Sequence, residues 1–165
     1  MKFLSRGELM ASHTLVYKIH KGIVSVEDYV AWAYTLLQNN VSSNSVNIIA
    51  SLAPNHNLFE VEDYFQRALN ELQMELPTIE PSSRAYIALL ATKILKEGND
   101  IEIFNLAKEI FNIVSDLQYP EDLIEWYNIS EMVDCIEYDK SPLDFNKEDI
   151  KSKIKEESRH LLSSL

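Results

Sequence analysis

The chain has 165 residues, of which 46% are hydrophobic and 25% charged, and this composition is typical of a globular protein and excludes a disordered one. Three Gly and five Pro are fewer than the turns of a β-sandwich or an α/β fold of this length need, which favours helices joined by short polar loops. A net charge of −11 argues against direct binding to nucleic acid, because such binding draws on Lys and Arg that neutralise phosphates.

Apolar residues at helical spacing predict four helices in the first half of the chain. Gly22 ends the first helix, and Ser25 caps the second, whose first turn carries Glu27 and Asp28. Pro54 follows the third helix at the start of a turn. The expected ranges are 5–20, 26–38, 43–52 and 61–74.

Four more helices are expected in the second half. Pro77 and Pro81 bracket the longest irregular connection, after which Ser82 or Ser83 caps a fifth helix that stops at Gly98. The remaining ranges are 101–117, 120–138 and 146–162. We therefore predict an all-α fold without a sheet, either a single bundle or a short array of helical hairpins. We expect one domain over residues 1–165, in which 146–165 form a polar, frayed C-terminal helix.

One internal repeat stands out. Val26-Glu-Asp-Tyr29 recurs as Val61-Glu-Asp-Tyr64, 35 residues later, and Ala33 and Leu37 match Ala68 and Leu72. A period near 35 residues is that of stacked helical hairpins. The alternative is that the two segments are simply amphipathic helices with similar acidic starts.

The residue patterns that mark most enzymes are missing from the sequence. Gly7, Gly22 and Gly98 are too far apart to form a phosphate-binding loop. Cys135 is the only cysteine, and on a helix such a residue usually packs as a small hydrophobe. Glu157-x-x-His160 resembles half of a di-iron motif but occurs once. We expect no catalytic site, no cofactor and no metal.

Arg6 and His13 leave one catalytic alternative open. Six residues separate them on one expected helix, which is the spacing found in helical RNases of the HEPN type. The polar residue usual after that Arg is replaced by Gly7, and the acidic chain lacks the basic surface that an RNA substrate needs.

Charge is distributed unevenly along the chain. No Lys or Arg occurs from Gly22 to Gln66 or from Glu109 to Asp139, and the second stretch holds nine acidic residues. A face of one sign speeds encounter with a partner of opposite charge, whereas a surface selected only for solubility mixes the signs. The stretch after Asp139 is instead rich in Lys.

The seventh expected helix carries the candidate binding residues. At 100° per residue, one side holds Trp126, Ile129, Val133 and Ile136, and a second stripe holds Ile124, Tyr127, Glu131, Asp134 and Tyr138. Tyrosines among carboxylates are typical of protein interfaces. The residues predicted for partner binding are Asp122, Glu125, Tyr127, Glu131, Asp134 and Tyr138. In the alternative, the tyrosines pack against the last helix, whose Lys residues pair with the acids.

The segments GIVSVEDYVAWA (22–33) and NLFEVEDYFQRAL (57–69) resemble small helical bacterial immunity proteins of polymorphic-toxin and contact-dependent growth inhibition systems. The resemblance implies a protein that binds a cognate toxin domain, such as a basic nuclease, and covers its active site. The residues themselves, apart from the resemblance, predict a cytoplasmic protein without direct contact to membrane, because the N-terminus lacks the apolar core of a signal peptide and no apolar run approaches the roughly 20 residues of a membrane span. The net charge already argues against direct contact with nucleic acid. A helical adaptor or repeat scaffold is the alternative, and the HEPN-like RNase is the second.

Overall fold

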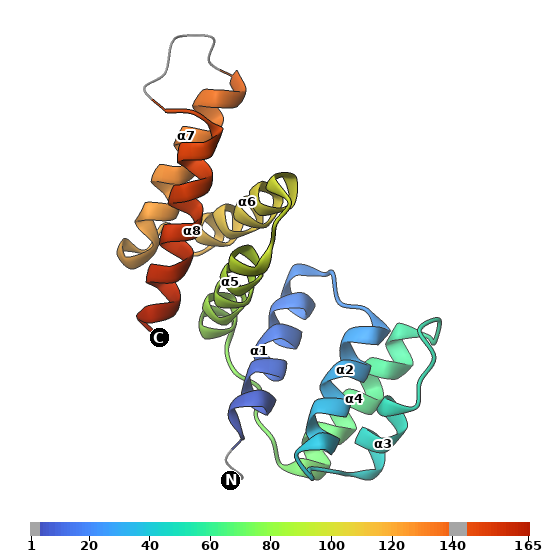
Figure 1. The fold of residues 1–165 in the computed structure, drawn as a ribbon. Helices are drawn as coiled ribbons and strands as arrows, with labels where there is room; N and C mark the ends of the chain where they lie inside the picture. Colours follow the sequence, from blue (N-terminus) through green and yellow to red (C-terminus); the bar gives the residue numbers. More distant parts are fainter. Residues whose placement is uncertain (1–3, 139–144) are drawn as a thin grey trace. The chain divides into compact units, whose positions relative to one another are not determined.

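The computed structural model describes residues 4–138 and 145–165 (Figure 1). In this part of the chain there are eight α-helices and one 3-10 helix, 78% of the residues are helical, and no strand occurs. The elements are α1 (Arg6–Lys21), α2 (Val26–Gln38), α3 (Asn44–Ala50), α4 (Leu58–Leu72), α5 (Ile79–Lys96), α6 (Asp100–Asp116), η1 (Glu121–Leu123), α7 (Ile124–Tyr138) and α8 (Lys147–Ser163). The prediction of an all-α fold with about eight helices is confirmed.

The chain divides into two compact units, residues Met1–Ala85 and Tyr86–Leu165, and the division falls inside α5. Each unit packs its own core, so each has its own description below. A single domain over residues 1–165 stays a prediction.

Unit 1 is built from successive helices whose ends are fixed by caps. Ser5 and Glu8 form a capping box at the start of α1, and Ser25 and Asp28 form another at the start of α2. Gly22 ends α1 with a left-handed φ of 70°, which explains why glycine suits this position. Both caps predicted at Gly22 and Ser25 are confirmed.

Aromatic rings dominate the core of unit 1. The ring of Phe65 on α4 meets those of Tyr29 and Trp32 on α2 edge to face, at centroid distances of 5.2 and 4.9 Å. The indole Nε1 of Trp32 donates to the buried Ser12 hydroxyl of α1 at 3.2 Å. The side chain of Trp32 is only 1% exposed, and this hydrogen bond provides a partner for its only polar group, the indole N–H.

The two copies of the 35-residue repeat lie on α2 and α4, which contact each other. Ala33 and Ala68 are both fully buried. The copies nevertheless occupy different places on their helices, because Val26 is the first residue of α2 whereas α4 begins at Leu58. The predicted start of the fourth helix at residue 61 is therefore wrong by three residues, since Asn57 caps this helix.

The predicted start of the fifth helix is also wrong. Helix α5 begins at Ile79, so Pro81 lies in its first turn, where a missing N–H costs no intrahelical hydrogen bond. Ser82 and Ser83 are buried inside the helix and are not caps. The hydroxyl of Ser82 donates to the carbonyl of Thr78 at 2.7 Å.

In unit 2, α7 packs against α6 on one side and α8 on another, and α6 also contacts α8. Figure 1 shows α7 and α8 side by side, running in opposite directions. Helix α8 is continuous from Lys147 to Ser163, and Asn146 and Asp149 form a capping box at its start. The residues of α6, α7 and α8 with no exposed surface are Ile103, Ala107, Ile110, Trp126, Ile150, Ile154 and Ser158.

Among the helices of the described residues, none combines the length and the apolar character that crossing a membrane requires.

Candidate partner-binding site

The buried and exposed faces of α7 alternate as the sequence spacing predicts. Trp126, Ile129 and Val133 are buried, and Ile136 is half-buried. The members of the second stripe are all exposed: Ile124, Tyr127, Glu131, Asp134 and Tyr138. Because residues three and four apart are neighbours on a helix surface, these side chains form one continuous strip.

The strip borders a surface groove of about 460 Å³ between α6 and α7, here called the α6–α7 groove. Four of the six residues predicted for partner binding line it: Tyr127, Glu131, Asp134 and Tyr138. The other lining residues are Lys108, Phe111, Asn112, Val114, Ser115, Tyr119, Ser130, Val133 and Glu137. The structure therefore brings most of the predicted site into one hollow, and adds residues from α6 and the turn that follows it.

Two tyrosines meet at this groove. The rings of Tyr119 and Tyr127 lie edge to face, with centroids 5.2 Å apart and planes at 78°. Gln118 and Tyr119 have φ angles of 63° and 56°, in the left-handed region that non-glycine residues rarely adopt. Each such residue costs about 1–2 kcal/mol. The fold thus keeps a strained turn at the place where Tyr119 is held against Tyr127.

Carboxylates make the groove electrostatically negative. The charge of Glu131, together with its hydrogen bond from the phenol, raises the pKa of Tyr127. On the other helix, Lys108 Nζ pairs with Glu137 Oε1 at 2.8 Å. That hydrogen bond raises the pKa of Lys108, and the charges of Glu137 and Asp134 add to it. The described lining holds three carboxylates, Glu131, Asp134 and Glu137, against one cation, Lys108, so the groove carries a net negative charge.

Asp122 and Glu125 do not line the α6–α7 groove. They line a second hollow of about 530 Å³ between α7 and α8, here called the α7–α8 groove. Its other polar side chains are Glu121, Lys153, Glu156, Glu157 and His160. The six residues predicted for partner binding thus flank α7 in two separate grooves.

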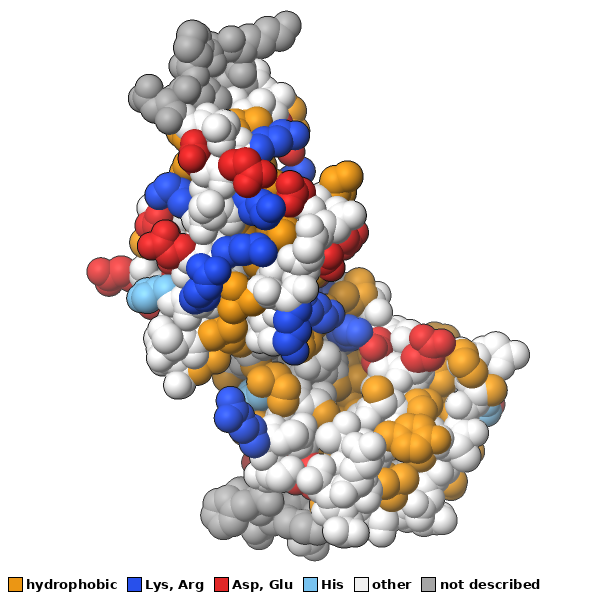
Figure 2. Space-filling view, in the orientation of Figure 1, with side chains coloured by type: hydrophobic (Ala, Val, Ile, Leu, Met, Phe, Trp, Pro, Cys, Tyr) orange, Lys and Arg blue, Asp and Glu red, His pale blue; other side chains and the backbone are white. Residues whose placement is uncertain are grey.

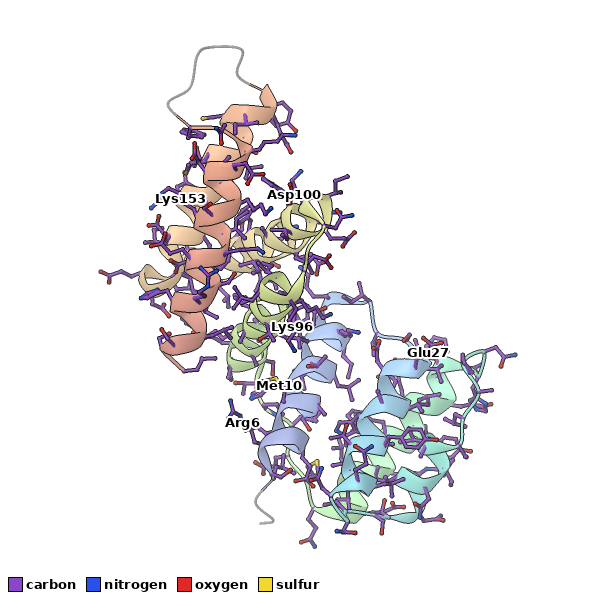
Figure 3. The ribbon with its side chains drawn as sticks, in the orientation of Figure 1. Arg6, Met10, Glu27, Lys96, Asp100 and Lys153 are labelled. Carbon is purple, nitrogen blue, oxygen red and sulfur yellow. The ribbon has the colours of Figure 1, made fainter. Side chains whose placement is uncertain are left out.

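Two lysines of α8 contact the turn between α5 and α6 and the first residue of α6. Lys151 Nζ lies 2.7 Å from Asp100 Oδ1, and Lys155 donates to the carbonyl of Glu97 at 3.5 Å. Figure 3 labels Asp100 at the start of α6 and Lys153 on α8. Among the described residues, those lining the α6–α7 groove come from α6, the turn after it and α7, and none comes from α8. This differs from the alternative given above, in which the tyrosine strip packs against the last helix.

The face shown in Figure 2 carries Lys and Arg side chains intermixed with Asp and Glu over α8. This mixture contrasts with the described part of α7, which holds no Lys or Arg. Asp139, the last acid of the cation-free stretch, lies outside the described residues.

Arg6 and His13 of the RNase alternative both lie on α1. Arg6 is exposed, and His13 is half-buried, about 10 Å away along the helix axis. His13 Nδ1 lies 3.0 Å from Ser82 Oγ, whose own proton goes to Thr78, so Nδ1–H is the donor. Burial lowers the pKa of His13, which keeps the ring neutral near pH 7.

The other reactive residues considered in the sequence form no cluster. Cys135 is a half-buried free thiol on α7. His160 Nδ1 lies 3.4 Å from Glu157 Oε1, and among the described residues no group of three or more His, Cys, Asp or Glu is arranged to hold a metal ion.

Comparisons with models of protein families, with curated proteins and with solved structures gave no match. The resemblance to immunity proteins is therefore supported by the quoted segments alone.

Sequence reasoning missed most of the residues that line the α6–α7 groove, and Tyr119, Lys108 and Glu137 are the most informative of them. Tyr119 stands just before Pro120 between two helices, and only the fold shows that its ring meets Tyr127. Lys108 and Glu137 pair across 29 residues of sequence, and no local pattern predicts that contact. The high density of acids from Glu109 onwards was the one available signal for Glu137.

Proposed function

We propose that this chain is a cytoplasmic immunity protein that binds a basic toxin domain, such as a nuclease, and covers its active site. The observation that carries the proposal is the α6–α7 groove, in which exposed tyrosines stand among carboxylates on α7. Aromatic anchors surrounded by charged groups are the composition of protein-binding surfaces. A nuclease presents a cationic cleft made for phosphate, and the negative groove complements such a cleft.

The net charge of −11 supports the same proposal through the rate of encounter. A one-signed surface steers an oppositely charged partner, and the association rate then falls as salt screens the field. An adaptor that docks through apolar contacts would show little dependence on salt. The helical hairpins of unit 1 favour that adaptor as the alternative, because hairpin arrays commonly bind partners along one face.

The HEPN-like RNase stays a second alternative on the spacing of Arg6 and His13. It requires His13 to exchange a proton with RNA. The hydrogen bond to Ser82 occupies one ring nitrogen, which leaves only Nε2 for that task. Loss of RNA cleavage in a His13→Ala variant would favour this alternative over immunity.

The test uses the C-terminal domain of the toxin encoded beside this gene. Stopped-flow binding is measured between about 20 and 500 mM NaCl, a range over which the screening length shrinks several-fold. We expect the association rate to drop steeply as the salt concentration rises. We also expect the double variant Glu131→Lys/Asp134→Lys to bind more weakly, while its thermal unfolding temperature hardly changes.

The matched control reverses Glu102 and Glu109 to Lys. Both are exposed on α6 and lie outside the lining of the α6–α7 groove, and the net charge changes equally. We expect this control to retain most of the affinity. Equal loss in both variants assigns binding to overall charge and not to the groove. The immunity proposal is rejected if the neighbouring gene encodes no toxin-like domain or if that domain does not bind.

A further inference from the structure

The α6–α7 groove combines two kinds of group that together select a cation. Tyr119, Tyr127 and Tyr138 provide exposed aromatic rings, and Glu131 and Asp134 provide carboxylates one helix turn apart. Aromatic faces attract cations through the ring quadrupole, and carboxylates attract them by charge. A volume of about 460 Å³ lies within the range of pockets that hold a small ligand or one large side chain.

The chain contains a complete example of the contact that such a groove offers. On α4, Arg67 pairs with Asp63 at 2.7 Å, while its guanidinium carbon lies 5.6 Å from the centre of the Tyr64 ring. One guanidinium thus engages a carboxylate and a tyrosine together. The α6–α7 groove has the tyrosines and the carboxylates, and its described lining holds no arginine.

Arginine fits this groove better than lysine. A guanidinium is planar, stacks on an aromatic face and presents several N–H donors in one plane to two carboxylates. An ammonium group is compact and strongly hydrated, so it gains less from a tyrosine ring. We propose that the α6–α7 groove receives an arginine side chain of the protein partner, with a tyrosine ring against the guanidinium and Glu131 and Asp134 as its ion-pair partners. This inference rests on the proposed function and specifies which partner side chain the groove selects.

Lys108 gives the groove a cation of its own. It pairs with Glu137, and both side chains stay substantially exposed, at 48% and 38%. An incoming arginine is repelled by Lys108, whose charge also offsets that of the neighbouring Asp134. Replacing Lys108 by an uncharged residue should therefore strengthen the binding of a cationic partner. If Lys108 instead contributed a polar contact to the partner, the same replacement would weaken binding.

The experiment measures binding of two blocked hexapeptides, hexa-arginine and hexalysine, to the full chain by fluorescence anisotropy at low salt. Because a cation–π contact at an exposed site is worth about 0.5–1 kcal/mol, we expect hexa-arginine to bind about two- to five-fold more tightly. Tyr127→Leu should remove this preference, and Tyr127→Phe, which keeps the ring, should retain it. Tyr34→Leu, at an exposed tyrosine of α2, is the matched control and should change nothing. In Lys108→Met we expect both peptides to bind more tightly.

Equal binding of the two peptides, or an arginine preference that survives Tyr127→Leu, would overturn the inference. A second outcome is that both peptides bind with equal affinity and that the double variant Glu131→Lys/Asp134→Lys binds neither. The acidic binding surface is then supported, and only the preference for arginine is rejected. If each peptide binds the wild-type chain and that double variant with the same affinity, the groove is not a cation site. The proposed function is then no longer supported by the groove.

Discussion

Lys18 Nζ lies 2.6 Å from Asp28 Oδ1, and this ion pair joins α1 to α2. The other oxygen of the same carboxylate accepts from the backbone N–H and the hydroxyl of Ser25, each at 2.9 Å. One side chain thus closes the N-terminal cap of α2 and ties that helix to its neighbour.

Replacement of Asp28 by Asn should destabilise unit 1 by about 1–2 kcal/mol at pH 7, since a cap and a partly buried ion pair are weakened together. Burial would raise the pKa of Asp28, but the hydrogen bonds from Lys18 and Ser25 and the charge of Lys18 outweigh it, so the pKa is lowered. A lowered pKa means that the carboxylate stabilises the fold above the unfolded pKa of about 3.9, and that this contribution is lost as the pH falls through the folded pKa.

Urea unfolding at a series of pH values checks this prediction. The gap between the wild type and Asp28→Asn should close below about pH 4, near the unfolded pKa. Glu27→Gln, at the exposed acid beside Asp28, serves as control and should show a much smaller gap. A gap of unchanged size at the lowest pH would contradict the account.

Ser12→Ala should cost about 1–3 kcal/mol, because the indole N–H of Trp32 would lose its only hydrogen-bond partner in a buried place. The change is measured by chemical denaturation. Thr14→Ala on the same helix removes a hydroxyl that only bonds back to the carbonyl of Met10, and it should change stability by less than about 0.5 kcal/mol. Equal effects of the two variants would count against the role given to Ser12.

Gln118→Gly should stabilise unit 2 by about 0.5–1 kcal/mol, because glycine adopts the φ of 63° without the strain that a side chain brings. Gln66→Gly, at an exposed position inside α4, should instead destabilise by about the same amount. Differential scanning calorimetry distinguishes the two signs. A loss of stability in Gln118→Gly would show that the left-handed conformation carries no strain to relieve.

Tyr127 should ionise at a higher pH than an ordinary tyrosine, since Glu131 lies beside its phenol. A raised pKa means that the interaction stabilises the fold below the ordinary pKa of about 10 and is lost as the pH rises through the folded value. Spectrophotometric titration of the wild type minus Tyr127→Phe isolates this phenol. Glu131→Gln should move its midpoint down, and Asp134→Asn should move it less. An unchanged midpoint in Glu131→Gln would exclude Glu131 as the cause.

Local signals in the sequence predicted the helices well where a cap and an apolar pattern agree. Ser25 and Gly22 are examples, because both act through bonds to residues within four positions. The start of α5 failed because Pro81 is as compatible with a first helical turn as with a loop, and only long-range packing buries Ser82 beside His13. The start of α4 failed because Asn57 is a common residue in both turns and N-caps.

The candidate site was predictable only in the part that lies on one helix. Helical spacing places Tyr127, Glu131 and Asp134 on one strip, since that relationship is fixed by helix geometry. It does not reveal which neighbour faces the strip, so Tyr119 and Lys108 were missed. Asp122 and Glu125 were grouped with the strip because they are close in sequence, although their direction of exposure differs.

The two roles of α7 are divided between different residues. Trp126, Ile129 and Val133 hold unit 2 together, whereas Tyr127, Glu131 and Asp134 face outward. Under the proposed immunity function, this division means that surface substitutions on α7 can change which partner is bound at almost no cost to folding. Under that proposal, related proteins would keep the interior of α7 while their outward residues diverge, so that one scaffold serves to bind different toxin domains.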